Sequence, residues 1–376
     1  MPHTPARRAV LRLGAALAGA GVLGAADPAV AAPGAQKGVQ GPWRMPDERS
    51  PHSRTFMAWP PEGPVWGAWA PRVRRDIAAL ARAIAEYEPV VLLARPGDVR
   101  DARCRTGGAA EVWPVPVDDL WVRDTGPVSV LRADGARAGL DLGFNGWGGK
   151  QTHFHDHRVA RRVLRRTGTP RIRPGLVAEG GSLEADGQGT LLVTESSLVN
   201  ANRNPGLSRD EIERVLKHAL GVEKVIWLRG VRGHDITDCH VDALARFAAP
   251  GVVVLSRPSR DAGPVWAGVY AQAREVLREA TDARGRRLTL VELPEAEPSE
   301  LGDRGEDFLA SYVNHYVCNG AVILPRFGDR RGDARAVSLL RDLHPDREVR
   351  QVAIDTVAEG GGGVHCATQQ ETAPGA

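Results

Sequence analysis

The chain has 376 residues, of which 42% are apolar and 25% are charged, the proportions of an ordinary globular protein. These proportions exclude a wholly disordered chain, and four cysteines are too few for a disulfide scaffold of this length. Lys and Arg number 49 against 46 Asp and Glu, and this near-even charge argues against a nucleic-acid-binding protein.

The N-terminal segment has the pattern of an export signal. Arg7 and Arg8 precede an apolar run of small residues, Leu11–Ala26, and an A-x-A cleavage site ends at Ala31. The paired arginines resemble a twin-arginine signal, and the apolar run is too short and too rich in glycine to span a membrane well. We therefore expect residues 1–35 to be an export signal with its linker, and the mature protein to be exported without a stable membrane span.

In the rest of the chain, five segments with the apolar spacing of a helix are each followed by a strand-like run. The third helix is the best marked, since Ser208 and Glu211 form a capping box at its start and Gly221 marks its end. The helices are expected near residues 77–84, 159–164, 212–219, 265–277 and 337–343, and the strands that follow them near 90–93, 172, 225–228, 288–291 and 349–354.

Further β-rich runs lie between these helices, at 128–131, 190–194, 252–256 and 321–324. Each unit thus consists of strands, a helix and a strand, with roughly 68 residues per unit, a length that suits a supersecondary repeat. No linker divides the chain, so we expect residues 36–376 to form one α/β domain. A closed ring of five α/β modules and a doubly wound sheet both fit this pattern.

Four segments concentrate polar residues that packing does not require: 118–127, 179–182, 233–242 and 359–370. In the third, His240 and Asp242 are two residues apart, and on an extended segment their side chains leave the same face. In the last, Cys366 follows a run of four glycines, where nearby backbone amides would favour a thiolate. A cysteine with a histidine elsewhere in the chain is a candidate nucleophile and base.

Three carboxylates, those of Asp124, Glu179 and Asp242, would make the pocket around this pair strongly anionic. A protease that attacks a neutral amide has no use for such a pocket, which argues against a papain-like cysteine hydrolase. A site for a planar guanidinium cation does need such a pocket, because two carboxylates can each accept paired N–H bonds from the cation.

Longer motifs run in order from about residue 43 to residue 370: Met45–Glu48, Met57–Pro60, Trp121–Pro127, Gly143–Lys150, Glu179–Ser182, Asn200–Pro205, Ser311–Asn314 and the Gly-rich segment ending in His365-Cys366. With these motifs the sequence resembles the agmatine deiminases and the related Porphyromonas-type peptidylarginine deiminases. The resemblance implies the pentein fold, a five-bladed pseudo-symmetric α/β propeller. It also implies hydrolysis of agmatine to N-carbamoylputrescine and ammonia through a covalent cysteine thiouronium, with peptidyl-arginine deimination to citrulline as the alternative.

The resemblance implies a role for each matching residue. Cys366 would be the nucleophile and His240 the general acid and base, with no metal or organic cofactor. The partner would be a small guanidine, agmatine or an arginine-containing peptide, and a homodimer stays open. The substrate contacts that the resemblance and the tryptophan positions suggest are Asp124, Asp242 and Glu179, which would also act in catalysis, together with Asn314 and Trp121, although Trp121 and Trp147 fit a core position equally well.

The sequence departs from the family pattern beside these residues. Cys239 stands where a glycine normally precedes the histidine, Ala243 where an asparagine follows the aspartate, and Gly363 replaces an asparagine in the Gly-rich segment. These differences bear on the identity of the substrate more than on the chemistry. A disulfide between Cys239 and Cys366 under oxidising conditions is a further hypothesis.

Two other functions remain to be weighed. His153, His155 and His157 alternate along the chain, which could bind zinc and would fit a metal hydrolase, but a polar loop before a helix is the favoured interpretation. A secreted, non-catalytic binding module on the same scaffold is the other alternative. The intact set of cysteine, histidine and aspartates argues against it.

Overall fold

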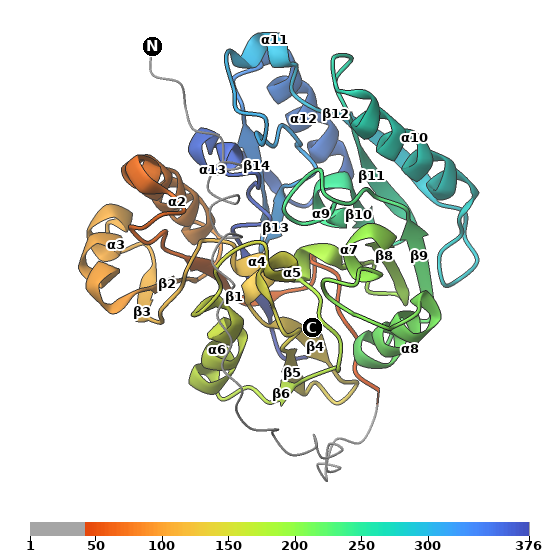
Figure 1. The fold of residues 1–376 in the computed structure, drawn as a ribbon, viewed down its shortest axis with the longest axis horizontal. Helices are drawn as coiled ribbons and strands as arrows, with labels where there is room; N and C mark the ends of the chain where they lie inside the picture. Colours follow the sequence, from red (N-terminus) through yellow and green to blue (C-terminus); the bar gives the residue numbers. More distant parts are fainter. Residues whose placement is uncertain (1–41, 376) are drawn as a thin grey trace, which may run out of the picture.

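The computed structural model describes residues 42–375, so the export signal predicted over residues 1–35 lies outside the described residues. Within the described part, the strands form five small sheets that follow one another around a common centre (Figure 1). This arrangement confirms the predicted five-bladed α/β propeller and rules out the doubly wound sheet. None of the helices in residues 42–375 is both long and apolar enough to cross a bilayer.

Four of the sheets repeat one strand order. The first two strands run antiparallel, and the second and third run parallel because a helix connects them. In chain order the sheets are β4 (Val128–Leu131), β5 (Arg137–Leu140) and β6 (Arg171–Ile172); β7 (Glu184–Ala185), β8 (Thr190–Thr194) and β9 (Lys224–Leu228); β10 (Ala245–Ala249), β11 (Val252–Arg257) and β12 (Thr289–Pro294); and β13 (Tyr316–Cys318), β14 (Ala321–Arg326) and β15 (Glu348–Ala353).

The fifth sheet joins the two ends of the described chain. Its strands are β16 (Gln369–Thr372), β1 (His52–Ala58), β2 (Val90–Ala94) and β3 (Glu111–Pro114), and β1 pairs with β16 antiparallel. An ion pair of 2.9 Å between Arg54 and Glu371 accompanies this pairing. The ring is therefore closed by strands that lie more than 300 residues apart in the sequence, and the sequence patterns predicted neither β1 nor β16.

The connecting helices cover the outside of the ring, as the periodic patterns predict (Figure 1). In α2, the apolar positions Val73, Ile77, Leu80 and Ile84 are fully buried, and each contributes about 1.5–3 kcal/mol relative to an exposed side chain. The connecting helices are α2 (Ala70–Ala85), α3 (Val99–Thr106), α6 (Val159–Thr167), α8 (Arg209–Leu220), α10 (Pro264–Glu279) and α12 (Arg330–Leu343).

The caps of α8 confirm the expected boundaries of that helix. Glu211 N–H donates to Ser208 Oγ at 3.3 Å and Ser208 N–H donates back to Glu211 Oε2 at 2.8 Å. Gly221 ends the helix with a left-handed φ of 62°. A Cβ at this glycine would also collide with the carbonyl oxygen of Trp43, so the position requires glycine for two reasons.

Short helical turns make up the other α-helices of the described part. They are α4 (Val122–Thr125), α5 (Gly146–Gly149), α7 (Glu195–Leu198), α9 (Val241–Leu244), α11 (Pro298–Leu301) and α13 (Asp355–Glu359). One of them corrects a prediction, because His240 is the extended residue before α9 and Asp242 lies within it. The extended segment predicted for this pair is wrong: the backbone turns in order to enter β10.

Glu88 is a buried carboxylate between α2 and β2 that connects two sheets. It accepts hydrogen bonds from Tyr316 Oη at 3.1 Å and the Asn319 amide at 2.7 Å, and it contacts Thr55 and His52. Burial by itself would raise the pKa of Glu88, but the hydrogen bonds from these groups outweigh it, and the pKa lies below its ordinary value.

We expect Glu88→Gln to lower the free energy of unfolding by about 2 kcal/mol at neutral pH. Because the pKa of Glu88 is lower in the folded than in the unfolded protein, its stabilisation is present above the unfolded value and is lost as the pH falls through the folded value. Urea denaturation of wild type and variant at pH 7 and at about pH 4 should therefore show a difference that shrinks in acid. An equal difference at both pH values would contradict the prediction.

Candidate active site

The predicted site residues occupy equivalent positions in the five sheets. Each lies a few residues before the first strand of its sheet, where the chain passes the centre of the ring. The repeated topology therefore brings one polar side chain per sheet to the same place. These residues are Asp124 before β4, Glu179 before β7, Asp242 before β10, Asn314 before β13 and Cys366 before β16.

Asp124 is held in place through both of its oxygens. Trp147 Nε1 donates to Oδ2 at 2.8 Å, and the amide of Gly181 donates to Oδ1 at 3.0 Å. Burial and the nearby charges of Asp242 and Glu179 raise the pKa of Asp124, although His240 opposes this shift. The carboxylate is thus oriented, and burial with the two neighbouring carboxylates outweighs the effect of His240 on its pKa.

The loop that carries Trp147 has an unusual backbone that its sequence permits. Trp147 itself has a left-handed φ of 54°, and Gly148 follows with φ of 80°. Asn145 stabilises the turn, because its side chain accepts from the Gly148 amide at 2.8 Å and donates to the Asn202 carbonyl at 2.9 Å. The turn places the buried indole under Asp124.

His240 lies between two carboxylates. Its Nε2 is 3.3 Å from Glu179 Oε2, and its Nδ1 is 3.7 Å from Asp124 Oδ1. Burial opposes a charged imidazole, but these carboxylates outweigh it and raise the pKa of His240 to about 9. His240 is therefore an imidazolium at neutral pH.

A buried ion-pair network orients Glu179. Arg203 Nε donates to Glu179 Oε1 at 3.0 Å, which leaves Oε2 for His240. Arg203 also binds Asp238, and Lys150 Nζ lies 2.7 Å from the same carboxylate. Burial would raise the pKa of Glu179, but His240 and Arg203 lower it, so this carboxylate stays ionised.

Cys366 is fixed by Asn314 at two atoms. The Cys366 amide donates to Asn314 Oδ1 at 3.2 Å, and Asn314 Nδ2 donates to Cys366 Sγ at 3.2 Å. The thiol also lies 3.5 Å from Asp242 Oδ2. Asn314 thus positions the sulfur, which is a more direct role than the sequence indicated.

The protonation state of Cys366 differs from the expected one. Burial, and the negative charges of Asp242 and Asp124, raise its thiol pKa well above the ordinary value. The Gly363 amide and Asn314 lower it, as expected of nearby donors, but by less. In the free protein this site therefore favours the thiol, and the thiolate expected from the sequence requires added positive charge.

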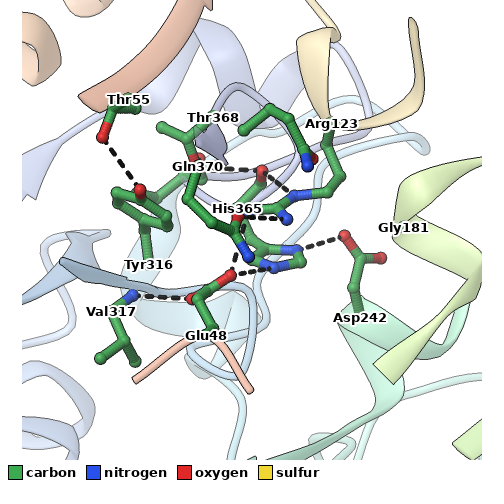
Figure 2. A network of polar contacts seen from close by, with 12 residues as sticks. Glu48, Thr55, Arg123, Gly181, Asp242, Tyr316, Val317, His365, Thr368 and Gln370 are labelled. Atoms are coloured by element: carbon green, nitrogen blue, oxygen red, sulfur yellow. Dashed lines mark hydrogen bonds and ion pairs between the residues drawn. The ribbon is translucent and has the colours of Figure 1, made fainter. Parts of the chain in front are cut away.

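Asp242 lies between this sulfur and a second histidine. Its Oδ2 is 2.8 Å from His365 Nδ1, whereas its Oδ1 is buried without a hydrogen-bond partner among the described residues (Figure 2). His365, beside the nucleophile in sequence, lowers the pKa of Asp242 against the effect of burial. Asp242 is thus ionised, with one acceptor oxygen available.

Gly181 borders the space that these groups surround. A Cβ built on Gly181 would lie 2.8 Å from Asp124 Oδ1, 2.8 Å from His240 Nδ1 and 3.0 Å from Asp242 Oδ2. Three charged groups, from the segments before β4 and β10, therefore meet around a position without a side chain in the segment before β7. The arrangement can hold a flat cation by its edges next to a sulfur.

Trp121 is a buried residue that packs against the Gly-rich segment. It packs 6.2 Å from Trp66 between ring centroids, and covers Gly362, where a Cβ would collide with the indole. The structure thus places Trp121 in the apolar core that supports the Gly-rich segment. Of the two tryptophans, Trp147 contacts a site carboxylate.

The histidine loop does not form a metal site. His153 Nδ1 is 2.9 Å from the Gln151 carbonyl oxygen and His157 Nδ1 is 2.8 Å from the His153 carbonyl oxygen, so both face the main chain. Across residues 42–375 no group of three or more histidine, cysteine, aspartate or glutamate side chains has metal-binding geometry. This geometry favours the polar loop over a metal hydrolase.

The two cysteines of the disulfide hypothesis are both free thiols. Cys239 is buried in the apolar cluster around β10 and β11, whereas Cys366 packs against the cluster around α2. The structure therefore gives the hypothesis no support.

Sequence reasoning assigned no role to Arg203, Glu48 or His365, although each contacts a predicted site residue or its partner. All three lie inside the motifs that carry the family resemblance. The charged residues of those motifs were therefore a usable signal, but their partners were not visible in the sequence.

Comparison with known proteins places these segments in one family. The sequence pattern of the Porphyromonas-type peptidyl-arginine deiminases matches residues 44–372. The agmatine deiminase of Pseudomonas aeruginosa (strain LESB58) is 39% identical over 355 residues, covering 88% of this chain and 96% of the relative. That of Stutzerimonas stutzeri is 39% identical over 353 residues, covering 88% and 95%. The solved agmatine deiminase of Enterococcus faecalis has a TM-score of 0.83 and 31% identity, covering 90% of this chain and 100% of the other.

Proposed function

The chain belongs to the Porphyromonas-type peptidyl-arginine deiminase family, and from this premise we propose that it hydrolyses agmatine to N-carbamoylputrescine and ammonia. The observation that carries the proposal is the meeting of Asp124, His240 and Asp242 around Gly181, beside the Cys366 thiol. The names of the relatives support agmatine as the substrate. The enzyme is accordingly a hydrolase of the C–N bonds of a guanidino group.

Substrate binding uses the two aspartates. A guanidinium is planar and presents N–H donors along its edges, which the carboxylates of Asp124 and Asp242 can accept. Asp242 Oδ2 lies 3.5 Å from the Cys366 sulfur, and its Oδ1 has no hydrogen-bond partner among the described residues. Held by its edges, the substrate turns the face of its central carbon toward the Cys366 sulfur.

Binding also activates the nucleophile. The negative charges of Asp242 and Asp124 contribute to the raised pKa of the Cys366 thiol, and a bound guanidinium offsets both. The thiol therefore releases its proton to solvent when the substrate binds, and the resulting thiolate attacks the guanidinium carbon to form a C–S bond.

His240 completes both halves of the reaction. As an imidazolium, with a pKa raised to about 9 by the carboxylates around it, His240 protonates the departing nitrogen, which leaves as ammonia. The remaining thiouronium is positively charged and stays next to the same carboxylates. Neutral His240 then takes a proton from water as the water attacks the thiouronium carbon, and the ureido product leaves Cys366.

An ammonia-release panel of agmatine, free arginine and arginyl peptides tests this function. We expect turnover of agmatine with the highest kcat/KM, because the deiminase relatives with high identity are named for it. A higher kcat/KM for arginyl peptides would assign the alternative, formation of peptidyl-citrulline. The absence of ammonia from all three substrates would contradict a guanidine deiminase.

A further inference from the structure

His365, the residue before the nucleophile, is buried between two carboxylates. Its Nδ1 is 2.8 Å from Asp242 Oδ2 and its Nε2 is 2.7 Å from Glu48 Oε2 (Figure 2). Only 2% of the residue is exposed. Both ring nitrogens therefore face an acceptor, with solvent largely excluded.

This geometry bears on how the His365 ring bonds to its two neighbours. A neutral imidazole has one N–H, so its other nitrogen would direct a lone pair at a carboxylate oxygen. The pKa values of Glu48 and Asp242 are both lowered despite burial, so both carboxylates are ionised. Both carboxylates can accept a hydrogen bond from the ring only when each ring nitrogen carries a proton.

Glu48 connects this histidine to the other sheets. It lies in the segment before β1, near the centre of the ring, where its Oε1 accepts from Arg246 at 2.8 Å and from the Val317 amide at 2.8 Å. Its Oε2 accepts from Arg123 at 3.0 Å. Because Arg246 is on β10, Val317 on β13 and Arg123 in α4, the position of Glu48 is set by three sheets.

We propose that His365 and Glu48 are positioning residues for Asp242: the Glu48 carboxylate holds a cationic His365, whose Nδ1–H fixes Asp242 Oδ2, the oxygen that lies 3.5 Å from the Cys366 sulfur. This inference rests on the proposed guanidine chemistry and names the groups that prepare one of its two carboxylates. The positive charge of His365 also keeps Asp242 ionised, although burial opposes a charged carboxylate there.

Charged groups from the elements packed around them face Glu48, His365 and Asp242. His365 and Glu48 face Arg123, Arg246 and Glu184, and Asp242 faces His240, Asp124 and the Cys366 thiol. Arg123 and His240 also lower the pKa of Asp242, but His365 is the nearest hydrogen-bonded partner. Removing His365 therefore removes the largest support for its charge.

Two substitutions separate the charge of His365 from its hydrogen bond. His365→Asn keeps an N–H near the position of Nδ1 without the charge, whereas His365→Gln places its amide near Nε2 and loses the bond to Asp242. We expect KM for the guanidine to rise about tenfold in His365→Asn and about a hundredfold in His365→Gln, with a smaller change in kcat. Glu48→Gln should resemble His365→Asn, because the imidazolium loses its second carboxylate.

The pH dependence of kcat/KM tests the positioning role of His365, because a loss of packing alone would not change it. In the wild type, Asp124 has the raised pKa and should alone set the acid limb of kcat/KM. Loss of the His365 cation raises the pKa of Asp242, so two carboxylates then titrate in the same range. In all three variants the acid limb should move by about one unit to higher pH and become steeper.

Glu88→Gln is the matched control, since it removes a buried glutamate from a network that does not reach Asp242. It should lower stability without changing the acid limb. Variants at His365 and Glu48 that lose stability but keep the wild-type KM and acid limb would overturn the inference.

A spectroscopic measurement makes this test independent of the reaction. In nitrogen NMR of the wild type, compared with His365→Asn to assign the ring, both nitrogens of His365 should carry protons at pH 7. A singly protonated ring would overturn the inference even in an active enzyme. Lack of turnover of every guanidine by a wild type with a doubly protonated ring would instead contradict the proposed function.

Discussion

Replacement of Cys366 by alanine is expected to lower kcat/KM for guanidine hydrolysis by about ten-thousandfold or more. The sulfur lies 3.5 Å from Asp242 Oδ2, and Asn314 fixes Cys366 at two atoms. Without the sulfur no covalent intermediate forms, so the carboxylates bind the cation but ammonia is not released. Ammonia assays with saturating agmatine measure the loss, and isothermal titration shows whether binding persists.

Cys366→Ser is a second form of this test, because a hydroxyl of similar size is a far weaker nucleophile. The matched control is Cys104→Ser, which changes an exposed free thiol in α3 and should leave activity unchanged. Residual activity of Cys366→Ala within tenfold of wild type would show that the sulfur is not the nucleophile.

A single methyl group at Gly181 should be nearly as damaging. We expect Gly181→Ala to lower kcat/KM by about a thousandfold, because the added carbon would lie within 3.0 Å of Asp124, His240 and Asp242. The atoms in its way are the ends of side chains, which can move aside. The free energy of unfolding should therefore change by about 1 kcal/mol or less, while the carboxylates lose their arrangement around the substrate.

The control for this substitution is Gly268→Ala on α10, where an added Cβ meets nothing within 4 Å. It should leave kcat/KM unchanged and raise stability by about 0.5–1 kcal/mol, because alanine favours a helix. A crystal structure of Gly181→Ala with agmatine bound as in wild type, together with full activity, would contradict the assignment of this space to the substrate.

Both expectations depend on how the charged groups of the site are placed around Cys366 and His240. Asp124 and Asp242 raise the pKa of Cys366, while the same carboxylates and Glu179 raise that of His240. A free thiol and a charged imidazole therefore coexist in the empty site. The substrate cation shifts the balance toward the thiolate, which restricts nucleophilic reactivity to the occupied enzyme.

Local patterns in the sequence were sufficient for five of the connecting helices, α2, α6, α8, α10 and α12, and for the strands that follow them, but not for α3 or the short helices. The apolar spacing of α2 and the capping box of α8 depend on residues within a few turns of each other, so these predictions were confirmed. The count of five units came from the same local signals. The family motifs then identified the residue types of the site, because the chemistry needs a sulfur, an imidazole and carboxylates.

What the amino-acid order alone determined is thus the set of local elements, the number of units and the identity of the reactive side chains. Only the tertiary structure decided that β16 pairs with β1, that α9 begins beside His240, and that His365 meets Glu48 across 317 positions of the chain. It also decided that the Cys366 thiol stays protonated. The reason is physical: a pKa, like a ring closure, depends on burial and on charges that approach one another only when the five sheets assemble.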